Sequence, residues 1–355
     1  MDEKDMKPIK IGLVGIGRAG WGIHAVELDS KTDMFEIVAA CDVIPERNQK
    51  MAEKYGCRTY DSIEELVKDE EVELVSIATR TVDHYNHVLC ALNAGKDVLV
   101  EKPMTMSYDQ AFDLFKRANK PGLPRLFVHQ QRRFESMFNL VYDTIKSGKL
   151  GKVYEINIEE NGFQHRDDWQ TLSEFGGGQL LNWGPHIIDH SLQLLGNPVK
   201  EFSSELKHIV AGGDCEDHLN LQFKDKEGTT VNMCISGATA LNCGRTFTVY
   251  GDRGALVAKG NTMTLRYISP DQIIPEVISD PETPGAAFGK TGTYASKLEI
   301  NWIEETIEAP KQDLTVFWDY LYKSYREGAT FPIKDDEILA IMKTISDAKA
   351  QNSVK

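Results

Sequence analysis

The chain has 355 residues, with 54 acidic residues against 40 Lys and Arg, so its formal net charge is −14. This balance excludes a broad basic face for nucleic acid, because nothing would neutralise a phosphate backbone. With 41% hydrophobic and 26% charged residues, the chain can bury a sizeable core, and its length predicts two domains. Apolar runs stay well short of the ~18 residues of a membrane span. Six cysteines are scattered without a C-x-x-C pair, so we expect a cytoplasmic protein with reduced thiols that contacts no membrane.

Short β-rich runs alternate with amphipathic helical stretches through the first third of the chain. Strands are expected at 9–14, 35–41, 74–78 and 97–100, and helices at 19–28 and 84–94. This alternation requires right-handed crossovers and predicts a doubly wound parallel sheet with helices on both faces. A stretch rich in Pro and Gly at 120–124 ends the pattern. We therefore predict a nucleotide-type α/β domain over residues 1–123.

Longer period-two runs characterise the rest of the chain. They lie at 152–159, 201–209, 217–223, 229–236 and 245–250. Alternating runs joined by short turns predict a mostly antiparallel sheet. Helices at 314–326 and 336–348 close the chain. Residues 124–355 are thus predicted to form a second, α+β domain.

A glycine-rich turn joins the first predicted strand to the first helix. Gly15, Gly17 and Gly20 fit G-x-G-x-x-G, with Arg18 and Ala19 between the last two glycines. These glycines permit a tight turn, close approach of a pyrophosphate and close helix–sheet packing, while the helix N-terminus offers free N–H groups. The pattern predicts a dinucleotide site, and the alternative is an α/β turn without a ligand.

An acidic residue ends the second predicted strand. Asp42 lies 22 residues after Gly20, where a carboxylate binds the adenosine ribose hydroxyls. A carboxylate there repels a 2′-phosphate and so favours NAD over NADP. Arg47 lies close enough in sequence to keep NADP possible.

Two further segments bear residues suited to proton transfer. Lys102 follows Glu101 at the carboxyl end of a predicted parallel strand, the edge at which such sheets bind ligands. Desolvation would lower the pKa of Lys102, although a lysine in a surface turn is the alternative. Asn182 and His186 follow a run of three glycines and are four residues apart, so they share one face of a predicted helix. His186 could instead be a core histidine.

A metal site is a further alternative for this second segment. Asp189 and His190 stand close to His186 in sequence, but no cluster of Cys, His or Glu supports them as ligands. We therefore predict no metal.

These segments occur in an order typical of one family. They are the glycine turn, Cys41-Asp42, Thr79 followed by His84, the run 94–103 and the run 176–189. On these motifs the chain resembles the glucose-fructose oxidoreductase/inositol dehydrogenase (Gfo/Idh/MocA) family over nearly its whole length. The resemblance implies an N-terminal Rossmann domain, then an α+β domain with a large, mostly antiparallel open-faced sheet, assembled into homodimers or homotetramers. It also implies a nicotinamide cofactor and hydride transfer at a carbinol of a sugar, sugar derivative or cyclitol.

The resemblance also assigns roles to individual residues. Lys102 corresponds to the catalytic lysine and His186 to the catalytic histidine of the family. Asn182 stands where the family usually has Asp, and an amide cannot accept a proton at neutral pH. We therefore expect His186 to be the main base and Lys102 to polarise the oxygen. Arg80 replaces a proline common after Thr79.

Further residues are expected to line the site. The motifs and the family resemblance together predict the following cofactor-binding residues: Gly15, Gly17, Arg18, Ala19, Gly20, Asp42, Thr79, Arg80, His84, Glu101 and Lys102. His165 and Trp169 would suit sugar hydroxyls and an apolar sugar face, unless their segment is an ordinary solvated turn. Gln130 and Arg132 would line the cleft with Lys102, Asn182 and His186.

Three functions are consistent with these residues. The first is an NAD(P)-dependent oxidoreductase, which needs a base and a positive hydrogen-bond donor at the reacting oxygen. The second is an enzyme that keeps NAD tightly bound and cleaves a glycosidic bond or rearranges a sugar. The third is a non-catalytic NAD-binding sugar sensor. Asn182 leaves room for the last two, whereas retention of both Lys102 and His186 argues against a sensor.

Overall fold

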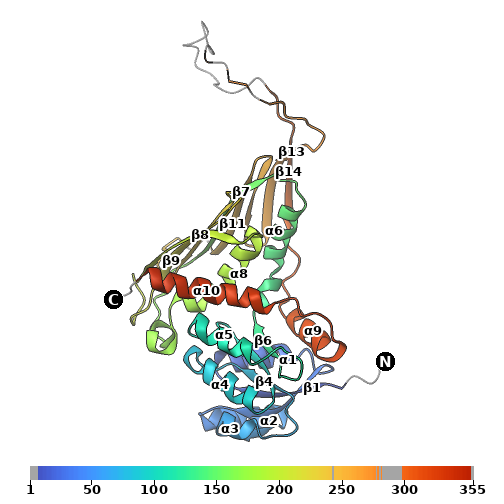
Figure 1. Cartoon of the computed structure of the whole chain (residues 1–355), viewed down its shortest axis with the longest axis vertical. Helices are drawn as coiled ribbons and strands as arrows, with labels where there is room; N and C mark the ends of the chain where they lie inside the picture. Colours follow the sequence, from blue (N-terminus) through green and yellow to red (C-terminus); the bar gives the residue numbers. More distant parts are fainter. Residues whose placement is uncertain (1–6, 242–243, 277, 280, 282–297, 353–355) are drawn as a thin grey trace.

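The chain forms two α/β units, one above the other in the view of Figure 1. This computed structural model describes residues 7–241, 244–276, 278–279, 281 and 298–352. The unit coloured blue to teal contains the smaller sheet, and the larger sheet rises above it in green to brown (Figure 1). Helix α10 (Asp335–Gln351) crosses between them and contacts α5, α8 and β8. This arrangement confirms the predicted α/β class.

The smaller sheet has six parallel strands in the order β3-β2-β1-β4-β5-β6. The strands are β1 (Ile9–Val14), β2 (Phe35–Cys41), β3 (Arg58–Tyr60), β4 (Leu74–Ile77), β5 (Asp97–Glu101) and β6 (Leu126–His129). The helical segments between them are η2 (Gly20–Ala25), α1 (Val26–Leu28), α2 (Pro45–Tyr55), α3 (Ile63–Leu66), α4 (Thr81–Asn93) and α5 (Tyr108–Lys116). The chain reverses its direction of winding between β1 and β4, and this switch point is where doubly wound sheets bind ligands. Because β6 pairs with β5, this sheet continues beyond residue 123.

The larger sheet has eight strands in the order β14-β13-β12-β11-β7-β10-β9-β8. They are β7 (Val153–Asn161), β8 (Val199–Lys207), β9 (His218–Asp225), β10 (Thr230–Ser236), β11 (Gly244–Gly251), β12 (Gly254–Lys259), β13 (Thr262–Ile268) and β14 (Trp302–Glu308). β7 and β10 pair in parallel, and the other neighbours pair antiparallel, as predicted for a mostly antiparallel sheet.

Helices cover one face of the larger sheet (Figure 1). The remaining helical segments are η3 (Gln131–Phe134), α6 (Ser136–Lys146), η4 (Trp169–Thr171), η5 (Ser173–Phe175), α7 (Gln179–Asn182), α8 (Gly184–Leu195), α9 (Val316–Tyr322) and η7 (Lys323–Glu327). Along β9, Leu219, Leu221 and Phe223 are buried, whereas Asn220 and Gln222 between them are exposed. In β9 the period-two pattern therefore places apolar residues beneath the helices and polar residues on the open face.

The end of the chain returns to the first sheet. Trp318 of α9 is fully buried, its ring lies edge-on to Phe35 at 5.3 Å, and its Nε1 donates to Glu27 at 2.7 Å. Within the described residues, no helix has both the length and the apolar composition needed to cross a bilayer. The described cysteines are free thiols, and Cys243 lies outside the described residues.

Candidate active site

The glycine turn after β1 has the geometry of a phosphate-binding loop. Gly15 has φ +87°, and a Cβ placed on Gly20 would lie 1.9 Å from the Gly15 carbonyl oxygen. Gly17 faces open space, because a Cβ there would meet nothing nearer than Arg47 Nη1 at 3.8 Å. A loop that keeps glycine where a side chain would clash with its own backbone, and that opens at the start of a helix, leaves backbone N–H groups free for a pyrophosphate. The loop thus fits a dinucleotide.

Asp42 sits at the tip of β2, against this loop. Its Oδ2 accepts from the Ile16 N–H at 2.6 Å, and its Oδ1 accepts from the Ile44 N–H at 2.9 Å. Arg47 Nη1 lies 3.2 Å from the same carboxylate, and its side chain stays 42% exposed. Asp42 therefore holds the glycine loop in place in addition to its expected contact with the ribose. A cation that could meet a 2′-phosphate stands directly beside it.

His84 lies behind the cofactor loop. The ring is buried, with Nδ1 2.8 Å from the Pro103 oxygen and Nε2 3.1 Å from the Thr79 oxygen. Burial lowers the pKa of His84 in spite of these two carbonyls. A neutral imidazole has one N–H and can donate to one of the carbonyls at a time. The ring is thus placed to hold the segments after β4 and β5, and Thr79 also contacts His87 Nδ1 through its hydroxyl at 3.0 Å.

Arg80 connects the Rossmann unit to the second unit. Its guanidinium lies 4.6 Å from the centroid of the Phe175 ring and 5.9 Å from that of Trp169. Trp169 is therefore brought beside Arg80, at the start of α4. His165 is exposed, and in the described part of the chain no hydrogen bond or ion pair joins it to the other predicted site residues.

Lys102 bridges the two units. Its Nζ donates to the backbone oxygen of Asn182 at 3.0 Å and so joins the end of β5 to the end of α7. Burial lowers the pKa of Lys102; Glu101 opposes this shift, and the positive charges of Arg132 and Arg18 add to it. Lys102 is therefore a more effective acid–base group than a surface lysine.

The expectation that Asn182 and His186 share one helix is wrong. α7 ends at Asn182, α8 begins at Gly184, and Trp183 lies between them. Pro185 has no N–H with which to continue the α-helical ladder. The His186 N–H bonds to the Trp183 oxygen, and the backbone oxygen of Asn182 is thereby left to accept from Lys102.

His186 is buried beside Lys102 and Gln130. Gln130 Nε2 donates to the Pro185 oxygen at 2.9 Å and lies 3.5 Å from His186 Nδ1. Burial lowers the pKa of His186 well below its usual range, and the positive charges of Lys102 and Arg132 lower it further. The imidazole is therefore neutral at pH 7 and can accept a proton.

Two arginines hold Trp183 next to these groups. The Arg132 and Arg245 guanidiniums lie 4.5 and 5.3 Å from the ring centroid of Trp183, and both pair with Glu135. Sequence reasoning missed Trp183, Arg245 and Glu135. Trp183 stands three residues before His186 and could have been suspected on that ground, whereas Arg245 is the second residue of β11 and belongs to no local motif.

The other polar residues of α8 point elsewhere. Arg133 donates to Asp189 through Nε at 2.7 Å and Nη2 at 2.5 Å. His190 has its Nε2 2.9 Å from the Arg132 oxygen, and its ring stacks on Phe138 at 3.9 Å. Asp189 is thus bound to Arg133, and His190 to the backbone of Arg132.

Comparisons with known proteins identify the family. Residues 9–129 match the Gfo/Idh/MocA oxidoreductase family with an NAD-binding Rossmann fold, and residues 138–257 match the Gfo/Idh/MocA C-terminal domain. The chain belongs to this family. It is an NAD(P)-binding oxidoreductase.

Similar proteins span nearly the whole chain. An uncharacterized oxidoreductase of Schizosaccharomyces pombe is 29% identical over 97% of this chain and 96% of its own length. A scyllo-inositol 2-dehydrogenase (NADP(+)) of Bacillus subtilis is 23% identical, covering 98% of this chain and 94% of that protein. The solved structure of the WlbA dehydrogenase from Bordetella pertussis, in complex with NADH and UDP-GlcNAcA, aligns with a TM-score of 0.76 at 20% identity over 97% of this chain and 96% of that one.

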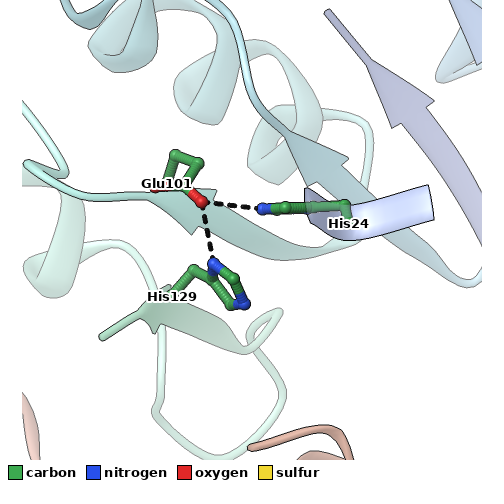
Figure 2. Close-up of side chains that lie close together, drawn as sticks. All are labelled: His24, Glu101 and His129. Carbon is green, nitrogen blue, oxygen red and sulfur yellow. Dashed lines mark hydrogen bonds and ion pairs between the residues drawn. The ribbon is translucent and has the colours of Figure 1, made fainter. Parts of the chain in front are cut away.

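One predicted cofactor residue of this family member turns away from the cleft. Glu101 precedes Lys102 on the chain and points into the core, toward His24 and His129 (Figure 2). Successive side chains at a strand end point to opposite sides, which separates Glu101 from the Lys102 amine. Lys102, Asn182, His186, Gln130 and Arg132 are brought together, and Glu101 stands behind them.

Proposed function

We propose that the protein is an NAD-dependent dehydrogenase that transfers hydride between the nicotinamide and a carbinol of a sugar, sugar derivative or cyclitol. The contact between Lys102 Nζ and the Asn182 oxygen carries the proposal. It places a desolvated amine of the Rossmann unit against the segment of the second unit that bears His186. An amine and a neutral imidazole then face one cleft at the edge where the glycine loop opens.

The chemistry follows from the protonation states of these two groups. When bound, the nicotinamide supplies the hydride acceptor. The Lys102 ammonium donates a hydrogen bond to the carbinol oxygen and stabilises negative charge there. The neutral His186 takes the hydroxyl proton as the C–H bond breaks, so the alcohol loses one hydride and one proton. In the reverse direction the protonated His186 returns the proton to the carbonyl oxygen.

Three observations support the finer parts of the proposal. Asp42 stands at the ribose position and supports NAD, with NADP possible through Arg47. The B. subtilis relative named for scyllo-inositol and the WlbA complex with UDP-GlcNAcA support a cyclic polyol or sugar substrate. The open face of the large sheet, which exposes Tyr250, Val257 and Trp302, supports a homodimer or homotetramer.

A substrate panel with matched variants tests this function. Purified protein is offered sugars, sugar acids and cyclitols with NAD or NADP, and formation of reduced nicotinamide is followed by absorbance. We expect turnover with NAD on at least one polyol. Lys102→Ala and His186→Ala should each lose at least ~100-fold in kcat, with NAD affinity by calorimetry close to wild type. Lys200→Ala, an exposed lysine of β8, serves as the control.

Other outcomes would point to the alternative functions. Wild-type turnover in Lys102→Ala or His186→Ala would overturn the assigned roles. Product formation from a glycoside with co-purified NAD and no net reduction would instead support the glycoside-cleaving or sugar-rearranging enzyme. A protein that binds NAD and sugar but reduces nothing in the panel would be a sensor.

A further inference from the structure

A buried cluster of His24, Glu101 and His129 lies directly behind Lys102. Figure 2 shows the two imidazoles converging on one carboxylate oxygen, with His24 coming from η2, Glu101 from β5 and His129 from β6. Glu101 Oε1 is 2.9 Å from His24 Nε2 and 2.8 Å from His129 Nδ1. Both histidines are fully buried, and Glu101 is 5% exposed. The mechanism proposed above uses none of these side chains.

The cluster is part of a chain of contacts that runs from the cleft to α9. Glu101 Oε2 accepts from the backbone N–H of Lys102 at 3.0 Å. His24 Nδ1 lies 2.8 Å from the Ser76 hydroxyl. On the other side, His129 Nε2 faces Glu27 Oε2 at 3.5 Å, and Glu27 accepts from Trp318. The carboxylate of Glu101 is thus held by three N–H donors.

The geometry favours a neutral ring at His24 and a positively charged ring at His129. Their ring centroids are 4.4 Å apart, so two charged rings would repel each other. His24 has a hydroxyl on its second nitrogen, which suits a neutral ring, whereas His129 lies between the carboxylates of Glu101 and Glu27. A cluster with His129 as imidazolium and Glu101 as carboxylate has no net charge.

The pKa shifts agree with this assignment. Burial lowers the pKa of His24, and the charge of His129 lowers it further. Burial also disfavours the charged form of His129, but Glu101 and Glu27 outweigh it and raise the pKa of His129 to about 9. Burial alone would raise the pKa of Glu101, but the charge of His129 and the two imidazole hydrogen bonds bring it well below its usual range.

The interatomic distances favour hydrogen bonds over a metal centre. The three candidate ligand atoms lie within 4.8 Å of one another. The two contacts to Glu101 are 2.8 and 2.9 Å, shorter than the roughly 3.3 Å that separates neighbouring ligands of a tetrahedral zinc ion. Each of these two nitrogens is placed to donate a proton to the carboxylate, so the cluster binds protons.

We propose that the buried His129 imidazolium neutralises the Glu101 carboxylate behind Lys102 and thereby keeps that carboxylate from competing with the substrate oxygen for the charge of the Lys102 ammonium. His129 and Glu101 are then positioning residues, and the catalytic meaning of their effect rests on the function proposed above. Without the imidazolium, Glu101 becomes an uncompensated negative charge adjacent to Lys102. A negative charge holds an ammonium in its protonated form.

The charged and titratable groups around the two residues define the expected shift. Lys102 is influenced by Glu101 of β5, Arg18 of the glycine turn, Arg132 of η3 and His186 of α8. His129 is faced by Glu101, His24 of η2 and Glu27 of α1, while α9 presents the uncharged rings of Phe317 and Trp318. Of the groups facing His129, Glu101 also acts on Lys102. His129 can therefore tune Lys102 through Glu101.

Two matched substitutions separate the charge from the hydrogen bond. His129→Asn keeps an N–H donor near the position of Nδ1 but removes the positive charge. His24→Gln keeps an N–H donor near the position of Nε2 and exchanges one neutral group for another. The pH titration of Lys102 is followed by NMR in lysine-labelled full-length protein, with its signal assigned by its absence from Lys102→Met. We expect the midpoint in His129→Asn to rise by roughly one pH unit and that in His24→Gln to match wild type.

The readouts need neither substrate nor turnover. Identical Lys102 midpoints in all three proteins would overturn the inference. If His129→Asn does not fold, histidine-labelled wild-type protein gives the answer: an imidazolium at His129 above pH 7 supports the inference, and a neutral ring overturns it. Stoichiometric bound metal that both His24→Gln and His129→Asn lose would also overturn it. A protein with the expected titration that oxidises no carbinol would refute the proposed function alone.

Discussion

Replacing Gly20 by alanine tests whether the glycine turn is a cofactor cradle. A Cβ on Gly20 would lie 1.9 Å from the Gly15 oxygen and 3.0 Å from the Gly15 carbonyl carbon. Both are backbone atoms, so no flexible side chain can yield. The same substitution at Gly22, two residues further along the same helix, meets nothing within 4 Å. Gly22→Ala is therefore the matched control.

The size of the clash sets the size of the effect. Ordinary contact begins at 3.4 Å, so the turn must open by 3.4 − 1.9 = 1.5 Å. Forcing such a shift costs about 1–3 kcal/mol, which corresponds to a Tm lower by about 2–12 °C at ~2–4 °C per kcal/mol. The displaced Gly15 carbonyl belongs to the loop that would hold the pyrophosphate, so we expect NAD to bind at least ~10-fold more weakly, about 1.4 kcal/mol. Gly22→Ala should instead gain up to ~1 kcal/mol, because alanine is the better helix former.

Calorimetric titration with NAD and thermal unfolding in the absence of nucleotide measure the two effects separately. The comparison that matters is Gly20→Ala against Gly22→Ala. If both variants bind NAD as wild type does, the turn is not a cofactor cradle, whatever the change in Tm. A lower affinity for NAD in Gly20→Ala, with wild-type affinity in Gly22→Ala, supports the turn as a cofactor cradle.

The remaining predictions concern cofactor choice and pH. Asp42→Ser removes the carboxylate beside Arg47, so the preference for NAD over NADP should fall by roughly tenfold, measured as the ratio of the two dissociation constants; an unchanged ratio would contradict the role of Asp42. Asn182→Asp adds a carboxylate to the residue whose backbone oxygen Lys102 contacts, so the Lys102-dependent limb of the pH–rate profile should move to higher pH; an unchanged or lower midpoint would contradict this. The pKa of His129 is about 9 in the folded state against an ordinary value of 6.5, so its stabilising effect is fully present below pH 6.5 and is lost as the pH rises through about 9. Urea unfolding on both sides of this window should show a larger loss of stability in wild type than in His129→Asn, and equal losses would refute the assigned protonation state.

Local sequence patterns were sufficient for the architecture. The alternation of short apolar strands with helices predicted the parallel sheet, and the period-two runs predicted the antiparallel one. The glycine turn was predictable because its spacing reflects contacts within a few residues. The position of Lys102 at the ligand-binding edge was predictable, because the carboxyl ends of the strands in a doubly wound sheet form that edge.

Other features depended on the tertiary structure. The helix expected from the spacing of Asn182 and His186 is interrupted at Trp183: the His186 N–H bonds to the Trp183 oxygen, and the Asn182 oxygen is the one that Lys102 contacts. Arg245 reaches Trp183 from a strand some sixty residues further along the chain. Neither contact leaves a periodic signal in the sequence.

The cluster of His24, Glu101 and His129 behind Lys102 shows most clearly what depends on local sequence and what depends on tertiary structure. The sequence by itself determined that Glu101 and Lys102 end a buried strand, because hydrophobic periodicity and turn residues are properties of neighbouring residues. Only the tertiary structure decided that Glu101 meets His24 and His129, from segments 77 and 28 residues away. Their meeting depends on the order of strands β1, β4, β5 and β6 in the sheet and on burial, which removes water and makes one protonated imidazole the partner of one carboxylate.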